Sequence, residues 1–568
     1  MEINVKNFEE TFDVVVRDIQ QAEFLAIDAE FTGLTDKNLG LLDTVEERYE
    51  KLRTSTNYSL VQFGLAVFFR EKEGGYSHRA YNFPVFGGFS RKFSVNTDSL
   101  ILISESGFSL DDMVKNGIPF LNLDEEEKLR LKIEEWKKQQ EAELLQKVTN
   151  KIGPSAILFE ESEYMNAIFS KVERFLLSPD TRLEIENSSR YQRKLMFEHL
   201  RYRYPDLSFE SIEGNGSRIF VIEKKPKEEQ LKILHEKEKE KLKELEEKVG
   251  FSRIVREISK SKKLIMGHNM TLDIIHILHQ FISSVPYIYT DFKDMLTETF
   301  PRFIDTKVIA AAQPVWDKIQ DSSLPTLIET IKRGILPVPN LKDPKPGRGF
   351  ILTDDKLHNA GFDAFITGVC FMSMMQYLAK IGGTVSLLES TGFVEFPLTE
   401  PYLNKLHMMR SIDVKYMNIG GEELQTERSN VFYATFPRHW KSIDLISLFK
   451  PLGNVEIQWI DDVSALIAVM DRSKKDSVIS MVNKSSSADV ISISTYSEYR
   501  KSTVKRSNRK RNLITSTPSS KRKVEDSNFD EKAMDTLSGS QVVMKCNLTA
   551  ENKLPVASIS NVFDTPSW

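Results

Sequence analysis

The segment that most constrains the fold is FLAIDAEFTGL at residues 24–34. Its apolar run ends in two carboxylates two residues apart, Asp28 and Glu30, and the chain then turns at Gly33. Side chains at i and i+2 of a strand lie on one face, so both acids would point together from the end of a core strand. Neighbouring like charges raise each other's pKa unless a cation lies between them. The segment therefore predicts a Mg²⁺ site, since this ion prefers oxygen ligands. An edge strand with solvated acids is the alternative if no further ligands exist.

Two later segments supply such ligands. GHNMTLD at 267–273 follows an apolar run and ends in Asp273, and HNAGFDAFITG at 358–368 contains His358 and Asp363. Three acidic segments beside apolar runs fit the two-metal scheme of phosphoryl transfer, in which two ions hold the attacking and leaving oxygens. The chain thus predicts one acidic site built from distant segments.

Two histidines compete for the role of general base. His268 and His358 each lie five residues before an aspartate of the acidic set, so spacing does not separate them. His268 follows an expected strand directly, where a turn histidine usually bonds the backbone, whereas His358 lies in a polar loop. A mobile imidazole that titrates near neutrality suits proton removal from a nucleophile, which favours His358.

These residues carry a resemblance to a known family. The chain resembles the DEDD 3′–5′ exonucleases, in the subtype with a histidine before the last aspartate, and among them the poly(A)-specific ribonucleases. The resemblance covers roughly residues 1–500. It is carried by the stretches MEI…NF, AIDAEFTGL, TVEERYEKLR, KNGIPFLN, GFSRIVREI, GHNMTLD, FPRFIDTK, AGFDAFITG and FPRHW…GNVEIQWIDD.

The resemblance implies a Mg²⁺-dependent 3′–5′ exoribonuclease that shortens poly(A) tails of single-stranded RNA and releases 5′-AMP. It also implies stimulation by the cap and a homodimer. By position, His358 matches the family's general base. The family's four metal-binding acids, which hold two Mg²⁺ ions, correspond to Asp28, Glu30, Asp273 and Asp363.

Further positions match family residues that contact RNA or the cap. Phe31 and Leu34 match positions that contact terminal bases, and Lys307, which could neutralise the scissile phosphate, matches one that contacts RNA. Trp459 matches the tryptophan that stacks on the 7-methylguanosine cap, where a cationic purine over an indole gains a cation–π contact. Each also has a plainer alternative: ordinary core for Phe31 and Leu34, a solvated lysine, and a half-buried tryptophan. Asp305, before Lys307, reads as a helix N-cap.

Composition limits the remaining classes. A chain of 568 residues is too long for one core and predicts about three or four units. The formal net charge of −5 disfavours a generally RNA-binding surface, so nucleic-acid affinity would be local. Cys370 and Cys546 are too few for a disulfide framework or a zinc site. We expect no membrane span, because no apolar run approaches the ~20 residues that a bilayer needs, and no secretory signal.

The order of elements predicts an α/β fold. We expect a ribonuclease-H-like mixed sheet with flanking helices, split by a small α/β insert and followed by an RNA-recognition-motif-like α+β domain and a disordered tail. The predicted parts are the first part of the nuclease domain at 1–155, the insert at 156–223, a charged helical tether or short coiled coil at 224–248, the second part of the nuclease domain at 249–420, the RNA-recognition-motif-like cap-binding domain at 428–500, and the tail at 501–568.

The insert and the tail each carry basic residues. In the insert they interleave with aromatics, which suits single-stranded nucleic acid, although an amphipathic helix with solvated arginines fits equally. The family's Arg-x-x-x-His signature is absent there, because Leu195 lies four residues before His199. In the tail, KRSNRKR at 505–511 and KRK at 521–523 resemble a bipartite nuclear localisation signal, with a weak RNA tether as the alternative. We therefore expect a protein of nucleus and cytoplasm.

Two other functions stay open. One is 3′-end trimming of small non-coding RNAs, by a related family whose members often end in a membrane anchor. The other is a non-catalytic adaptor that keeps the nuclease fold and binds RNA or protein. The presence of all five catalytic-type residues disfavours the adaptor.

Overall fold

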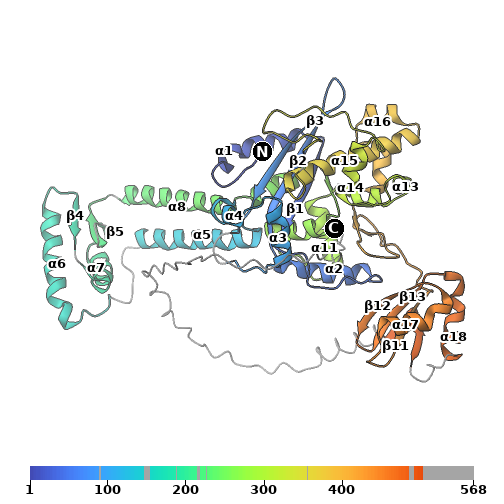
Figure 1. Cartoon of the computed structure of the whole chain (residues 1–568). Coiled ribbons are helices and arrows are strands. Elements are labelled where there is room, and N and C mark those ends of the chain that lie inside the picture. Colours follow the sequence, from blue (N-terminus) through green and yellow to red (C-terminus); the bar gives the residue numbers. More distant parts are fainter. Residues whose placement is uncertain are drawn as a thin grey trace, which may run out of the picture. The chain divides into compact units, whose positions relative to one another are not determined.

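The computed structural model describes residues 1–87, 91–145, 154–186, 188–213, 218–225, 227–354, 356–484 and 491–502. The chain divides into two compact units (Figure 1). The first comprises Met1–Leu39 and Asp43–Leu424, and the second comprises Gly40–Leu42 and Gln425–Trp568. The tail's basic clusters at 505–511 and 521–523 lie outside the described residues.

The first unit is built on a five-stranded mixed sheet in the order β3-β2-β1-β7-β8. Strand β2 pairs antiparallel with both β3 and β1, whereas β1, β7 and β8 run parallel to one another. This combination is that of a ribonuclease-H-like sheet, so the predicted fold class is confirmed. The strands are β1 (Phe24–Phe31), β2 (Leu60–Arg70), β3 (Tyr76–Pro84), β7 (Leu264–Gly267) and β8 (Phe303–Asp305).

Alternation along β1 divides the apolar core into two clusters. Leu25, Ile27 and the following odd-numbered residues join a cluster with helices α1, α9 and α10, whereas Phe24 and Ala26 join one with α15. Because Asp28 and Glu30 continue the even series, they lie on the face that α15 covers. The helices concerned are α1 (Phe8–Gln21), α9 (Ser252–Ser261), α10 (Thr271–Ile277) and α15 (Ala360–Ile381).

Helix α15 is, contrary to the sequence expectation, long and apolar enough to cross a membrane. It has 22 residues, and 78% of its apolar window is buried inside the structure. A buried helix that is hydrophobic all round is typical of the core of a large domain. Here α15 packs against β1 and β2, with Phe371 of the helix 5.5 Å from Phe24 between ring centroids.

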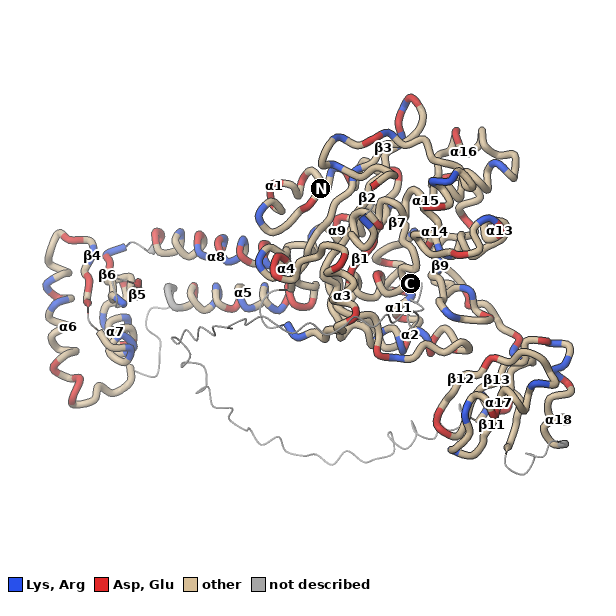
Figure 2. Tube along the Cα trace, in the orientation of Figure 1, with Lys and Arg blue, Asp and Glu red and all other residues tan. Residues whose placement is uncertain are grey.

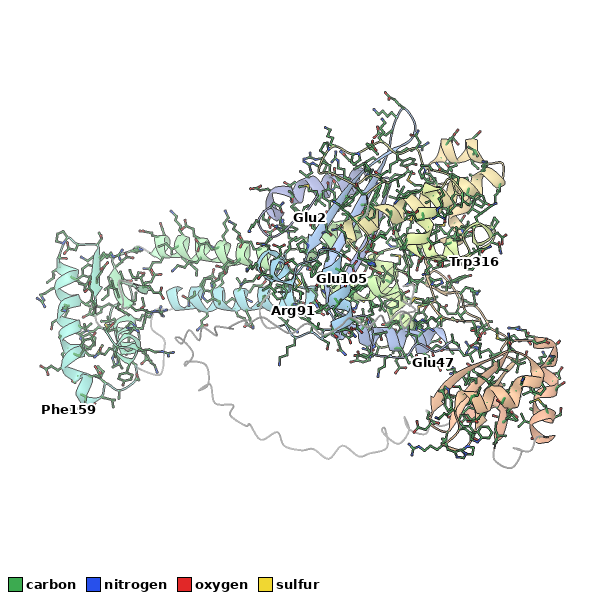
Figure 3. All side chains as sticks on the ribbon, viewed as in Figure 1. Glu2, Glu47, Arg91, Glu105, Phe159 and Trp316 are labelled. Atoms are coloured by element: carbon green, nitrogen blue, oxygen red, sulfur yellow. The ribbon has the colours of Figure 1, made fainter. Side chains whose placement is uncertain are left out.

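The insert is a small α/β domain with its own core. Its three strands pair antiparallel in the order β4-β6-β5, and two helices complete it. Phe159 begins α6 with its side chain almost wholly exposed (Figure 3). The elements are α6 (Phe159–Leu177), β4 (Arg182–Ile185), α7 (Arg190–Arg203), β5 (Ser208–Glu213) and β6 (Arg218–Glu223).

Two long charged helices, α5 (Leu123–Leu145) and α8 (Lys227–Val249), flank the insert in sequence. They pack against each other, with Lys137 Nζ 2.9 Å from Glu238 Oε2 and Lys241 over the ring of Trp136. Leu234 of α8 is buried. The segment expected to be a helical tether or a short coiled coil is a helix, and it is paired with an earlier one as the second alternative requires. Figure 2 shows charges of both signs along the pair.

The second unit has the strand–helix–strand–strand–helix–strand order of an RNA-recognition motif. Its sheet runs β12-β13-β11-β14, with all neighbours antiparallel. This confirms the predicted α+β domain. Its elements are β11 (Val431–Thr435), α17 (Ser442–Phe449), β12 (Val455–Asp461), β13 (Ser464–Val469), α18 (Val478–Lys484) and β14 (Ser492–Thr495).

Shorter elements complete the two units. They are α2 (Val45–Arg53), η1 (Thr54–Asn57), α3 (Thr97–Glu105), α4 (Leu110–Asn116), η2 (Leu278–Ile282), α11 (Tyr289–Thr299), α12 (Thr306–Ala310), α13 (Trp316–Ile319), α14 (Leu324–Lys332), α16 (Val385–Thr391), η3 (Pro397–Tyr402), β9 (Lys405–His407), β10 (Tyr416–Asn418), η4 (Lys450–Leu452) and η5 (Arg472–Ser477).

Candidate active site

Strand β1 supplies the first two carboxylates of the candidate site. Asp28 lies opposite Gly64 and Glu30 opposite Gln62 in the antiparallel register with β2, and the register shifts after Glu30. Burial raises the pKa of both acids well above its usual range. Neighbouring carboxylates, Asp363 and Asp273 among them, add to that increase. The two acids therefore share a space with the distant aspartates.

Asp273 comes from the first turn of α10, and it is buried. Burial raises the pKa of Asp273 to about 7. The turn before the helix is fixed by Asp305, whose Oδ1 accepts from Asn269 N at 2.7 Å and whose Oδ2 accepts from Met270 N at 3.2 Å. Asp305 also caps α12 by accepting from Lys307 N, as its sequence position predicted. One buried carboxylate thus orients the segment that carries Asp273.

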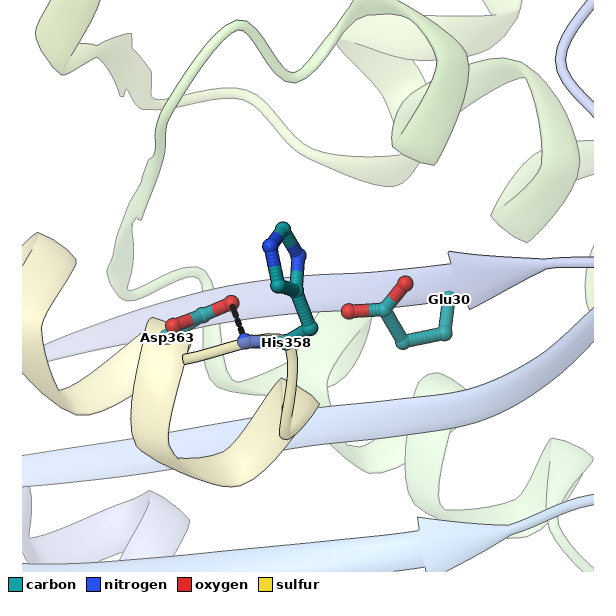
Figure 4. Close-up of side chains that lie close together, drawn as sticks. All are labelled: Glu30, His358 and Asp363. Carbon is teal, nitrogen blue, oxygen red and sulfur yellow. Dashed lines mark hydrogen bonds between the residues drawn. The ribbon is translucent and has the colours of Figure 1, made fainter. Parts of the chain in front are cut away.

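Asp363 and His358 lie at the start of α15. Asp363 Oδ2 accepts from His358 N at 2.9 Å (Figure 4). The candidate ligand atoms of Glu30, His358 and Asp363 lie within 4.8 Å of one another. His358 has a φ of 65°, a left-handed conformation that non-glycine residues adopt uncommonly, and its side chain is exposed. The loop is thus bent so that an accessible imidazole lies beside the half-buried carboxylate of Glu30 and the buried one of Asp363.

The other histidines of these segments are ill suited to take up a proton. Burial lowers the pKa of both His268 and His276 to about 3. His268 Nδ1 lies 2.9 Å from Thr306 Oγ1, which itself donates to Gly267 O, so the imidazole donates to the hydroxyl. His276 is buried against Phe31. His358 remains the better placed base, because its pKa is lowered by partial burial yet its ring stays accessible.

Gln62 is a residue of this site to which sequence reasoning gave no role. Its Oε1 accepts from Ala360 N at 3.0 Å, so it fixes the first turn of the helix that carries Asp363. Gly64 allows the close approach, since a Cβ there would lie 1.8 Å from Ala360 O. A polar residue and a glycine inside the apolar strand 60–70 were the available signal, but only the register with β1 places them opposite Glu30 and Asp28.

The donor set fits a pair of divalent cations. Asp28, Glu30, Asp273 and Asp363 offer carboxylate oxygens from three elements to one space. Among the described residues, the buried Oδ1 of Asp363 has no hydrogen-bond partner. Clustered buried carboxylates without a counter-charge raise one another's pKa, and hard cations with oxygen ligands remove that cost. The residues present therefore fit the metal site that the sequence predicted.

The three residues predicted to bind substrate are all partly or wholly enclosed. Phe31 is buried with its ring 4.7 Å from that of His276, and Leu34 packs against the same cluster. Lys307 is buried, and this burial lowers the pKa of its ammonium group although Asp305 and Asp321 oppose the shift. Packing in the core is enough to explain why Phe31 and Leu34 are apolar. A buried ammonium group, in contrast, is stable only beside an anion, because burial of an unpaired charge is costly.

Trp459, the predicted cap-binding residue, belongs to the second unit. It lies on β12 with 37% of its surface exposed, and its Nε1 donates to Ser442 Oγ at 3.2 Å. Its ring meets that of Phe436 edge to face at 5.1 Å. Since Phe436 belongs to the domain core, Trp459 lies on the helix side of the sheet.

A ribonuclease-H-like sheet with four clustered acids and an adjacent histidine defines a nuclease of the DEDD type. The chain belongs to the CAF1 family of ribonucleases: the model described as "CAF1 family ribonuclease" matches residues 3–371, and one described as "RNA binding domain" matches residues 421–502. The resemblance to poly(A)-specific ribonucleases, read from the motifs, is confirmed.

Individual relatives agree with this assignment. The chain is 35% identical to "Poly(A)-specific ribonuclease PARN" of Xenopus laevis, over 88% of this chain and 81% of the relative. It is 36% identical to the protein of the same name from Danio rerio, over 95% and 82%. It is 26% identical to "Pre-piRNA 3'-exonuclease trimmer" of Bombyx mori, over 84% and 90%.

Proposed function

We propose that this protein is a divalent-metal-dependent 3′–5′ exoribonuclease that shortens the poly(A) tails of RNA and releases 5′-AMP. The observation that carries the proposal is the gathering of four carboxylates beside His358. The higher identity to proteins named poly(A)-specific ribonucleases than to the trimmer favours poly(A) as substrate. The five acidic and basic groups of the site argue against a non-catalytic adaptor.

Asp28, Glu30, Asp273 and Asp363 would hold two Mg²⁺ ions. When bound, these ions neutralise the four acids and stabilise charge on the attacking and leaving oxygens of phosphoryl transfer. The chain's part is to keep four negative groups together at a point that RNA phosphates would otherwise avoid. Asp305 and Gln62 hold the two segments that bring Asp273 and Asp363 to that point.

His358 would take the proton of the attacking water on an imidazole nitrogen. Its backbone N–H is engaged by Asp363, so the loop is fixed while the ring stays accessible. A lowered pKa leaves the imidazole neutral at physiological pH, the form that a base requires. Attack of the water on the last phosphodiester would break the bond between phosphorus and the 3′-oxygen of the preceding nucleotide, which leaves as a 3′-hydroxyl. The phosphate then stays on the 5′-oxygen of the released nucleoside, which accounts for 5′-AMP as product.

Substrate and cap contacts form the finer part of the proposal. Lys307 would neutralise a phosphate near the scissile bond, and Phe31 and Leu34 would contact the terminal bases. Trp459 would stack on a 7-methylguanosine cap with the exposed part of its indole. The resemblance supports a homodimer, and the basic clusters at 505–511 and 521–523 support a protein of nucleus and cytoplasm.

The test compares the parent protein with Asp28→Asn and His358→Ala on labelled oligo(A). We expect both variants to lose 3′–5′ degradation while their circular dichroism is unchanged. Oligo(U), capped oligo(A) and a structured small RNA, run in parallel, separate deadenylation from trimming. If the variants degraded RNA as fast as the parent, the site assignment would be wrong and the adaptor would be favoured.

A further inference from the structure

Residues 1–3, which belong to the stretch MEI…NF, pair with the outer edge of the five-stranded sheet. Glu2 forms a parallel bridge with Asn82 of β3. Asn82 N donates to Met1 O at 3.0 Å, and Ile3 N donates to Asn82 O at 2.9 Å. The side chain of Ile3 is fully buried in the core. The backbone around Glu2 is thus fixed against one point of β3.

This point of β3 lies next to the first turn of α15. Asn82 is 2% exposed, and it lies opposite Gly64 in the antiparallel register with β2. A Cβ added to Gly361 would lie 3.2 Å from Asn82 Cβ and 3.0 Å from Tyr81 O, so the helix approaches β3 closely here. The turn that carries Asp363 therefore packs on the same residue that pairs with Glu2.

The side chain of Glu2 connects β3 to the loop of His358. Asn82 Nδ2 donates to both carboxylate oxygens of Glu2, at 3.1 and 2.8 Å. Partial burial raises the pKa of Glu2, and hydrogen bonds from Asn82 and Asn359 oppose that increase. Asn359 directly follows His358 and caps α15, since its Oδ1 accepts from Phe362 N at 3.1 Å. Glu2 therefore binds the side chain that joins the loop of His358 to the helix.

Two physical effects favour an acid at this place. The N-terminus of a helix carries partial positive charge, so a carboxylate beside the cap of α15 stabilises it. His358 has a φ of 65°, a conformation that costs free energy and persists only where its neighbours hold it. Asp363 accepts from His358 N on one side of this residue, and Glu2 accepts from Asn359 on the other. The strained loop is thus held from two sides.

We propose that Glu2 is a positioning residue for the general base. Through Asn82 and Asn359 it holds the loop that presents the imidazole of His358 to the attacking water. This inference rests on the proposed function, in which His358 takes the proton of that water. Because Glu2 acts on the orientation of the base and not on RNA binding, its loss should lower kcat and leave KM almost unchanged.

The test compares Glu2→Ala with Glu9→Ala in the full-length protein, on labelled oligo(A) with Mg²⁺. Glu9 is the matched control, because it is an exposed glutamate of the same segment whose carboxylate accepts from Arg253 of α9, at 2.6 Å, instead of from Asn359. We expect about 10-fold lower kcat for Glu2→Ala and no change for Glu9→Ala. Glu2→Gln keeps an acceptor for Asn82 and should restore kcat to within about 3-fold of the parent.

The double variant Glu2→Ala/His358→Ala separates positioning from a general loss of stability. If Glu2 acts through the imidazole, its removal costs little once His358 is absent, so the double variant should be as active as His358→Ala. A further loss of about 10-fold in the double variant would overturn the proposal. Equal losses of kcat in Glu2→Ala and Glu9→Ala, or unchanged kcat in Glu2→Ala, would overturn it as well.

Hydrogen exchange of the metal-free protein gives a second measurement that needs no catalysis. The amides of residues 356–362 should exchange about 5-fold faster in Glu2→Ala than in the parent, the factor expected for loss of one hydrogen bond, and at the parent rate in Glu9→Ala. A parent protein that degraded no RNA would contradict the proposed function. The exchange rate would then decide alone whether Glu2 holds this loop, and an unchanged rate would show that it does not.

Discussion

The five-stranded sheet of the first unit and the four-stranded sheet of the second unit position their functional side chains in different ways. In the first unit, strand alternation puts Asp28 and Glu30 on the face that α15 covers, and the same helix supplies Asp363. In the second unit, Trp459 is held by individual contacts with Phe436 and Ser442, on the helix side of its sheet. The first arrangement follows from backbone geometry and the second from side-chain packing. Variants of the first should therefore have the larger effects.

The largest effect is expected from Asp28→Asn. Loss of one of four clustered carboxylates should reduce deadenylation on the order of 10³-fold or more, because the charge that retains the cations falls. Degradation of oligo(A) under single-turnover conditions measures this. The same variant should raise the unfolding temperature of the metal-free protein, since it removes a buried like charge. Exposed Glu73→Gln serves as control, and similar activity of Asp28→Asn and this control would contradict the prediction.

Gln62→Leu should rank next. It removes the acceptor for Ala360 N while it keeps a similar side-chain volume. The first turn of α15 then loses the hydrogen bond that fixes its position, and with it the position of Asp363. A displacement of about 1 Å at a catalytic group can cost about 10²-fold, and we expect a loss of about 10–100-fold in kcat with little change in KM.

Gln280→Leu is the matched control for Gln62→Leu. Gln280 is also buried and also accepts from a backbone N–H, but its hydrogen bonds go to Leu60 of β2 instead of to α15. Both variants should lose similar stability, by about 1–3 kcal/mol each, since each leaves a buried donor unpaired. An equal loss of kcat in both would show that Gln62 acts only through stability.

The sequence was sufficient for the parts of this comparison that periodicity governs. Alternation predicted that Asp28 and Glu30 share a face, and apolar runs beside Asp273 and Asp363 placed them next to core elements. Gln62 was given no role because its partner, Ala360, lies 298 residues further along the chain and no local pattern links the two. A short coiled coil was one expectation for 224–248, but its partner α5 could not be named for the same reason, because each helix alone looks solvated.

The side of the sheet on which Trp459 lies could not be predicted either. The aromatic Phe436 that receives its ring comes after β11, and the serine that accepts its N–H begins α17. Tyr433, on the opposite face of β11, stacks on Tyr499 at 4.6 Å. Such contacts depend on how the helices and strands pack, which residue spacing does not contain.

The folding stability of the two units should change with pH in opposite directions. In the first unit, burial raises the pKa of Asp273 and Asp363 to about 7. Acids with raised pKa favour the folded state while they are protonated, so that contribution is lost as pH rises from about 4 to about 7. In the second unit, hydrogen bonds lower the pKa of Asp461, so its contribution is lost as pH falls.

Calorimetry in a chelator should therefore show the unfolding temperature of the first unit falling between about pH 4 and about pH 7, by several degrees. The second unit should show no such fall. Added Mg²⁺ should restore the first unit most at the higher pH, because cations compete with protons for the same oxygens. Asp363→Asn should flatten the slope. A slope that is the same in this variant would assign the pH dependence to other groups.

The smallest effect is expected from Trp459→Ala. The variant should weaken binding of a 7-methylguanosine cap analogue by about 3–30-fold, the range of a cation–π contact, and leave degradation of uncapped oligo(A) unchanged. Trp440→Ala is the control, because Trp440 also contacts Phe436, at 6.1 Å, but does not match the cap-stacking position. Equal loss of cap binding in both would mean that the aromatic cluster acts through folding of the domain. Loss of cap binding in Trp459→Ala alone would place the cap on the helix side of the sheet, away from the face that carries Tyr433. The two sheets would then differ in where the ligand binds as well as in how the functional side chains are held.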